Sequence, residues 1–160
     1  MRILVDADAL PADAKRILFR AAERLQIEIC LVANKALRVP DSPLFSSVLV
    51  GAGADVADNW IVEEVAAGDL VVTADIPLAS RVVDKGGCAL DPRGELYTDQ
   101  NVKDRLATRN LMDDLRSSNA LQGGGPAPFS KKDAQKFATK LDAYLVRGRA
   151  QGSLPGTERV

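Results

Sequence analysis

The stretch ILVDADALP, residues 3–11, decides the fold class of this 160-residue chain. Ile3–Ala7 is a short apolar run that ends in aspartates, which predicts a buried strand. Pro11 then begins a helix, because the first helical turn does not need the N–H that proline lacks. We therefore expect a strand that passes directly into a helix, and the same order recurs along the rest of the chain.

The remaining sequence alternates between short apolar runs and amphipathic segments. Further strands are predicted at Ile27–Ala33, Ser46–Val50, Leu70–Thr73 and Cys88–Leu90, and further helices from Asp55 to Gly68, from Asp75 to Gly86, from Thr98 or Asp99 through Leu115, and from Ser130 through Leu145. This alternation predicts an α/β three-layer sandwich with a mainly parallel sheet of four or five strands in the order 3-2-1-4-5, plus extra C-terminal helices. We expect a single domain over residues 1–147, a glycine-rich break at residues 123–126, and a flexible tail at residues 148–160.

Composition excludes several classes of protein. No apolar run approaches the length of a membrane span, and Asp6 and Asp8 come too early for the core of a signal peptide. We therefore expect a cytoplasmic protein that makes no membrane contact. The chain has no histidine, so imidazole is excluded both as a general base and as a metal ligand.

The charge is distributed unevenly along the chain. Residues 1–100 carry 10 Lys and Arg against 16 Asp and Glu, whereas residues 101–160 carry 11 against 6. An acidic body with a basic C-terminal third fits a metal site beside a surface that attracts a polyanion, and it also fits an ordinary solvated helix surface. The sequence pI of about 5.5 argues against strong non-specific DNA binding.

The aspartates that follow predicted strands are the candidate functional residues. In the expected strand order, the first strand lies beside the fourth, so Asp6, Asp8 and Asp75 fall at the carboxyl ends of neighbouring strands. Asp6 and Asp8 share one face if the strand continues through both, and Thr73 adds a hydroxyl. Such oxygen ligands suit Mg²⁺ or Mn²⁺, although capping of the following helix also explains Asp75 and one of the first pair.

A further acidic pair lies in the first turn of the predicted helix after residue 54. Asp55 is expected to cap this helix, and Asp58, one turn inside, is the better candidate for a ligand. Asp84 and Asp91 are weaker candidates for a fourth acid. Arg38 and Arg93 are candidates for substrate binding, because a guanidinium group matches phosphate geometry, although for each one taken separately a surface salt bridge is the favoured role.

Together these segments resemble the bacterial UPF0178 family, also called DUF188, whose fold is related to PIN-domain nucleases. The resemblance covers nearly the whole chain to about residue 147 and is carried by residues 5–11, 33–40, 54–59, 68–79, 89–97 and 124–126. Members usually have a cysteine where this chain has Leu10, which weakens any thiol mechanism. The family has no established activity. The likeness to PIN nucleases implies that Asp6, Asp58 and Asp75 bind the metal, with Asp8 as a fourth ligand.

Three hypotheses for the function follow. The leading one is a Mg²⁺- or Mn²⁺-dependent nuclease that hydrolyses phosphodiesters of RNA or single-stranded nucleic acid through Asp6, Asp8, Asp58 and Asp75. A second is a phosphatase resembling the haloacid-dehalogenase type, with Asp6 as nucleophile, Asp8 as general acid and Thr73 binding phosphate. A third is a non-catalytic module that binds nucleic acid or protein. A homodimer is compatible with all three.

Overall fold

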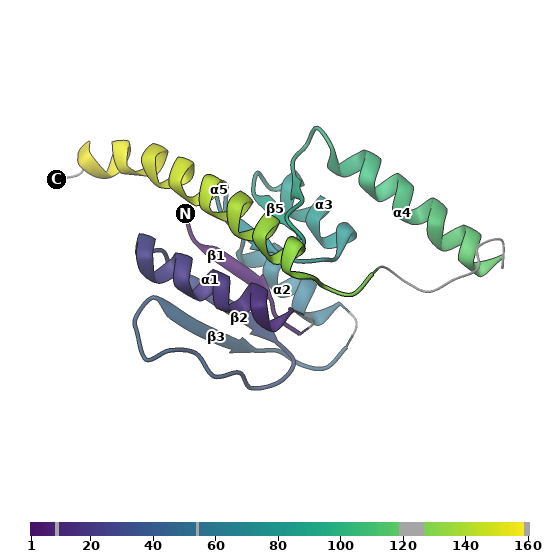
Figure 1. Ribbon diagram of the computed structural model, residues 1–160, viewed down its shortest axis with the longest axis horizontal. Coiled ribbons are helices and arrows are strands. Elements are labelled where there is room, and N and C mark those ends of the chain that lie inside the picture. The colour runs from purple at the N-terminus through teal and green to yellow at the C-terminus, as the bar shows by residue number, and fades with distance from the viewer. Residues whose placement is uncertain (9, 54, 119–126, 159–160) are drawn as a thin grey trace.

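The computed structural model describes residues 1–8, 10–53, 55–118 and 127–158, with side chains as far as residue 148. Strands and helices alternate over most of this length (Figure 1). In chain order the elements are β1 Ile3–Asp6, α1 Ala12–Leu25, β2 Ile29–Ala33, β3 Phe45–Leu49, α2 Val56–Glu64, β4 Leu70–Val72, α3 Ile76–Asp84, β5 Cys88–Leu90, β6 Leu96–Tyr97, α4 Val102–Ser117 and α5 Lys131–Glu158.

The strands form one mostly parallel sheet in the order β3-β2-β1-β4-β5-β6. The predicted order of the first five strands is confirmed, and so is the α/β class. The sequence did not predict β6, which pairs antiparallel with β5. A strand of two residues is too short to show an alternating pattern. The central position of β1, between β2 and β4, places the ends of these three strands beside one another.

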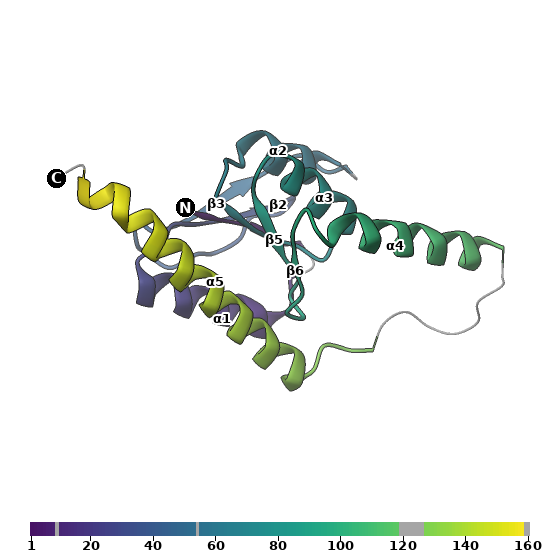
Figure 2. The same ribbon diagram turned by 90° about the horizontal axis from the view of Figure 1, so that it is seen from above.

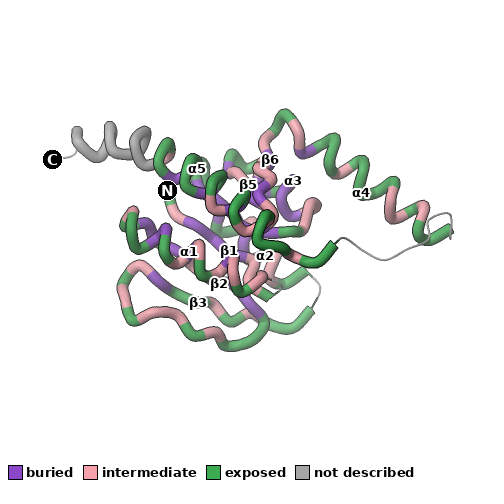
Figure 3. Tube along the Cα trace, viewed as in Figure 1, coloured by how far each residue is buried: buried purple, intermediate pink, exposed green. Residues whose placement is uncertain are grey.

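Helices cover both faces of the sheet (Figure 2). On one face, Ile3 and Val5 of β1 belong to the same buried cluster as Leu18 of α1 and Phe137 of α5. On the other face, Leu4 packs in a second cluster, together with α2 and α3 residues. The alternation follows from the period of two along a strand. Both faces of β1 are therefore buried, and its polar chemistry is confined to its carboxyl end (Figure 3).

Some predicted boundaries are wrong. The helix expected from Thr98 or Asp99 begins at Val102, because Asn101 rather than Thr98 is its N-cap residue. Residues 148–158, predicted as part of a tail, continue the backbone of α5 as far as Glu158. Whether this segment is flexible stays a prediction, and the glycine-rich break predicted at residues 123–126 lies outside the described residues.

Candidate functional site

The carboxyl ends of β1 and β4 bring Asp6 and Thr73 side by side. Val5 and Val72 are register partners, so the next residue of each strand shares one position at the sheet edge. The Thr73 hydroxyl donates to Oδ2 of Asp6 at 2.9 Å, and the backbone N–H of Asp75 donates to the same hydroxyl oxygen at 3.0 Å. Thr73 thus links the two aspartates and fixes the orientation of the Asp6 carboxylate.

Asp75 is the N-cap residue of α3, as predicted. Its Oδ1 accepts a hydrogen bond from the backbone N–H of Leu78 at 2.9 Å, and Pro77 in the first turn leaves no competing N–H there. This cap holds the carboxylate at the sheet edge beside β1. Burial raises the pKa of Asp6; its bond to Thr73 opposes the rise, and the charge of Asp75 adds to it.

Asp58 joins this pair from the first turn of α2. Burial raises the pKa of Asp58 to about 6, the charges of Asp75, Asp6 and Asp55 add to the rise, and Arg81 opposes it. Three carboxylates from different parts of the chain therefore lie close enough to repel one another. We name Asp6, Asp58 and Asp75 the carboxylate cluster.

The predicted capping role of Asp55 is wrong. It occupies the N-cap position of α2, but its side chain makes no capping hydrogen bond. Its φ of −115° and ψ of 5° lie outside the β region that aims an N-cap side chain at the free N–H groups of the first turn. Asp55 instead adds negative charge near Asp58.

Asp8 lies beside the carboxylate cluster, but not as predicted. The strand ends at Asp6, so the condition under which Asp6 and Asp8 would share one strand face is not met. Asp8 lies in the following turn, where both its carboxylate oxygens are 3.1 Å from the backbone nitrogen of Asn34, just beyond β2. Its charge still contributes to the raised pKa of Asp6. The last backbone hydrogen bond between β1 and β2 is donated by the N–H of Ala7 to the carbonyl of Val32, so the ladder ends before Asp8.

The donor set of the carboxylate cluster suits a partly hydrated divalent cation. Over the described parts of the chain, no three Asp, Glu, Cys or His side chains converge tightly enough to form a ready-made metal cage. Mg²⁺ typically retains several waters and is bound through one or two carboxylates together with substrate phosphate. The carboxylates of the cluster repel one another, and two of them are fixed in place: Asp6 by Thr73, and Asp75 by its bond from the Leu78 N–H. This arrangement fits a partly hydrated cation better than a closed site made of protein ligands alone.

Within the described residues, neither predicted arginine forms a hydrogen bond or ion pair with the carboxylate cluster. Arg38 is exposed in the loop that follows β2. Arg93, in the turn between β5 and β6, pairs with Asp133 Oδ2 at 2.9 Å and also donates to the carbonyl of Ala127. Its contacts connect this turn to the start of α5. The basic side chain that acts on the carboxylate cluster is Arg81, whose charge lowers the pKa of Asp58. Sequence reasoning missed Arg81, because nothing in the sequence indicates that α3 turns it toward α2.

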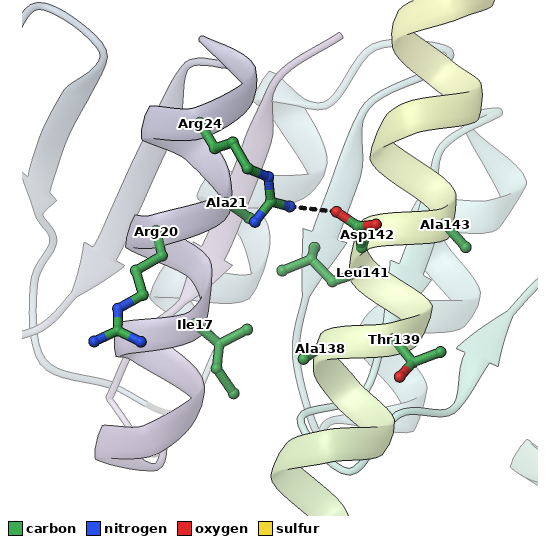
Figure 4. A pocket seen from close by; sticks show the side chains of 9 residues that line it. All are labelled: Ile17, Arg20, Ala21, Arg24, Ala138, Thr139, Leu141, Asp142 and Ala143. Carbon is green, nitrogen blue, oxygen red and sulfur yellow. Dashed lines mark hydrogen bonds and ion pairs between the residues drawn. The ribbon is translucent and has the colours of Figure 1, made fainter.

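A separate groove of about 720 Å³ lies between α1 and α5 (Figure 4). Ile17 and Leu141 contribute apolar lining, and Arg24 reaches across to pair with Asp142. None of the predicted site residues lines this groove. Volume alone therefore does not mark the candidate site of this protein, which is defined by the charges at the sheet edge.

The fold and the acidic sheet edge define a parallel α/β protein with a carboxylate cluster at the reversal of strand order. The family described as "Uncharacterized BCR, YaiI/YqxD family" matches residues 4–147. The chain belongs to this family, which confirms the resemblance seen in the sequence.

Its relatives match along almost their full length. A UPF0178 protein of Geobacter sulfurreducens is 55% identical over 147 residues, which cover 92% of this chain and 97% of the relative. A UPF0178 protein of Shewanella amazonensis is 58% identical over 147 residues, covering 92% and 98%. No solved structure matches the chain. Within the described residues, no helix combines the length and apolar character required to cross a membrane.

Proposed function

We propose that this protein is a Mg²⁺- or Mn²⁺-dependent nuclease that hydrolyses phosphodiesters in RNA or single-stranded nucleic acid. The observation that carries the proposal is the electrostatic coupling of Asp6, Asp58 and Asp75, which come from three different elements. After burial, the charge of Asp75 raises the pKa of both Asp6 and Asp58, and the charge of Asp6 raises that of Asp58; a cation bound among them would relieve this repulsion.

The residues around the cluster support the same chemistry. Thr73 holds one oxygen of Asp6 at 2.9 Å and leaves the other available. The cap to Leu78 similarly engages only Oδ1 of Asp75. Asp58, in the first turn of α2, makes no side-chain hydrogen bond or ion pair within the described residues. These three side chains would hold the cation, and Asp8 would remain bound to the backbone of Asn34.

A divalent cation bound there would activate water and stabilise the leaving oxygen of a phosphodiester. The protein's own contribution is to fix the carboxylates before substrate arrives. The hydroxyl of Thr73 contacts both Asp6 and the backbone of Asp75, so one side chain sets the spacing of β1 and the start of α3. Such preorganisation lowers the cost of orienting groups during the reaction.

The proposal is tested with end-labelled single-stranded RNA and DNA incubated with the protein in Mg²⁺, Mn²⁺ or EDTA. We expect cleavage with either metal, none in EDTA, and a loss of at least about 100-fold in rate for Asp75→Asn, on the order of the effect of removing one preorganised charge-stabilising group. Asparagine is a good N-cap residue, so this variant removes the charge and keeps the helix start.

Asp41→Asn is the matched control, because Asp41 is exposed in the loop before β3, at the opposite edge of the sheet. It should cleave like the wild type. Metal-independent cleavage, or equal activity of the Asp75 and Asp41 variants, would contradict the proposal and favour contamination or a binding module.

The phosphatase hypothesis has less support. It expects a second acidic pair near the carboxyl ends of the strands, and Asp113-Asp114 is the late pair in the sequence. Asp113 lies on α4, where it pairs with Arg109 at 3.2 Å and with Arg116 at 3.3 Å. Trapping a covalent acyl-phosphate on Asp6 would nevertheless establish this alternative.

A further inference from the structure

A row of side chains leads from the carboxylate cluster to the far side of the sheet. Val72 is in register with Val5 on one side and with Leu90 on the other. The residues that follow, Asp6, Thr73 and Asp91, therefore lie in a row along the sheet edge. Neighbouring strands are about 4.8 Å apart, so the backbones of Asp6 and Asp91 are separated by about 10 Å.

Asp91 forms one wall of a groove of about 610 Å³. The turn that contains Arg93 and Gly94 also lines this groove, together with residues of α4 and α5. Gly94 has a φ of +95°, and a Cβ there would lie 2.8 Å from the backbone of Lys136. The turn and the helix thus touch directly, and the groove has a fixed shape rather than being a gap between mobile parts.

Four cationic and three acidic residues, among them Asp91, line the groove, which leaves a formal net charge of +1. Its cationic residues are Arg93, Arg105, Lys136 and Lys140. Arg93 pairs with Asp133 and Arg105 with Glu95, so the arginines are neutralised by the carboxylates that line the same groove. Lys136 and Lys140 are exposed and form no ion pair within the described residues.

The same lysines belong to a stripe on the outer face of α5. Lys132, Lys136 and Lys140 recur every fourth residue, which places them about 6 Å apart along one side of the helix. They line a second, shallower hollow of about 210 Å³. Phe137, Leu141 and Leu145 are fully buried on the inner face and anchor the helix to the sheet. The stripe is therefore presented to solvent on a rigid support.

We propose that this groove, which we name the lysine groove, binds the phosphate backbone of a single-stranded nucleic acid close to the phosphodiester held at the carboxylate cluster. The inference rests on the proposed function and names its substrate-binding surface. A linear row of lysine side chains beside the carboxylate cluster fits a chain of phosphates. One of these phosphates would approach the carboxylates through the proposed divalent metal ion. Tyr97 and Phe137, each next in sequence to a residue that lines the groove, are buried, so binding should depend on charge rather than on base stacking.

The test is fluorescence anisotropy with a labelled 12-nucleotide single strand, as RNA and as DNA, in EDTA so that no cleavage occurs. We compare the wild type with Lys136→Glu/Lys140→Glu over a range of NaCl concentrations. We expect affinity to fall by about tenfold or more, and the slope of log K against log[NaCl] to become shallower by about 1.4, which corresponds to two lost phosphate contacts.

Lys103→Glu/Arg116→Glu is the control of matched charge. Both residues are exposed on α4, and neither lines the groove. In the control, the fall in affinity should be less than about a third of that in the groove variant, as expected for screened long-range charge. Lys136→Ala/Lys140→Ala, with thermal unfolding measured in parallel, separates loss of binding from loss of fold. Equal weakening in the groove variant and the control would overturn the inference, as would displacement of the strand by poly-glutamate at equal charge concentration.

The two proposals fail in different ways. If the wild type binds the strand and the lysine variant does not, but neither cleaves it with Mn²⁺, the lysine groove stands and the nuclease proposal falls. If the wild type cleaves with Mn²⁺ and the lysine variant has an unchanged KM, the nuclease proposal stands and the groove assignment is wrong.

Discussion

The two edges of the central sheet both carry aspartates, but these have opposite surroundings. At the amino edge, Asp69 precedes β4 and is 5% exposed. It accepts hydrogen bonds from the backbone of Arg2 at 3.1 Å and of Ala66 at 2.9 Å, and from Nε of Arg2 at 3.3 Å. At the carboxyl edge, Asp6 and Asp58 have raised pKa values, and the strongest charges near them are other carboxylates.

The different surroundings distinguish Asp69, which supports the fold, from Asp6 and Asp58, for which we propose a bound cation. A buried carboxylate surrounded by donors stabilises the native state. Carboxylates that repel one another cost stability unless a cation neutralises them. The comparison therefore makes the amino edge structural and the carboxyl edge functional, and it can be tested by perturbing each edge separately.

The largest effect is expected at the amino edge. Asp69→Ala should lower the free energy of unfolding by about 3 kcal/mol, because it leaves the Arg2 guanidinium and the partly buried backbone N–H groups of Arg2 and Ala66 without their acceptor. Urea denaturation with an unchanged m-value measures this loss. The comparison breaks if Asp58→Ala, measured in EDTA, destabilises the protein as much as Asp69→Ala does.

Metal should stabilise the protein through the carboxyl edge alone. At a Mn²⁺ concentration about tenfold above Kd, the gain is about 1.4 kcal/mol, which corresponds to a rise in Tm of about 3–5 °C for a domain of this size. Asp6→Asn should abolish the shift, and Asp41→Asn should keep it. An equal rise in all three proteins would assign the effect to scattered surface acids.

Removing the hydroxyl that joins the two aspartates should have an intermediate effect. Thr73→Val deletes the donor to Asp6 and the acceptor for the Asp75 N–H, so we expect a loss of about 1 kcal/mol. The pKa of Asp6 should rise further, because the lost hydrogen bond favoured its charged form. Thr73→Ser is the control, and carboxyl ¹³C NMR titration gives the pKa. If Ser and Val behave alike, Thr73 acts by packing only.

The smallest effect concerns pH. The folded pKa of Asp58, about 6, exceeds the unfolded value of 3.8. Between these two pH values the native state therefore binds more protons than the unfolded state. The contribution of this carboxyl to the stability of the protein is lost as pH rises through that window. Asp58→Asn should be more stable than the wild type at pH 8 by roughly 0.5 kcal/mol, because the group is partly solvated, and nearly equal to it at pH 4. Urea denaturation in EDTA at both pH values measures this difference in stability. If the wild type gained stability relative to the variant from pH 4 to pH 8, the predicted direction would be wrong.

The order of strands could be predicted from sequence because β1 and β4 are continuously apolar and each is followed by a helix start. The same signal located Asp6 and Asp75, since both directly follow buried strands. The end of β1 could not be predicted, because the last backbone bond to β2 runs from Ala7 to Val32 and the Asp8 carboxylate then accepts from the backbone of Asn34, and both contacts are long-range.

Side-chain partners were the least predictable part of the site. Thr73 was a candidate as a substrate-binding hydroxyl, whereas its observed contacts are to Asp6 and Asp75. Arg93 has a typical phosphate-binding side chain, but α5 supplies Asp133 as its partner. Asp6 and Asp133 come from elements distant in sequence from Thr73 and Arg93, and local patterns carry no information about such partners.

The central claim is that a divalent cation binds among Asp6, Asp58 and Asp75. Crystals soaked in MnCl₂, with diffraction collected at the manganese absorption edge, test this most directly. We predict an anomalous peak in contact with carboxylate oxygens of at least two of these residues, and no such peak in Asp58→Asn crystals. Manganese bound only elsewhere, or a carboxyl edge that stays empty at millimolar Mn²⁺, would contradict it.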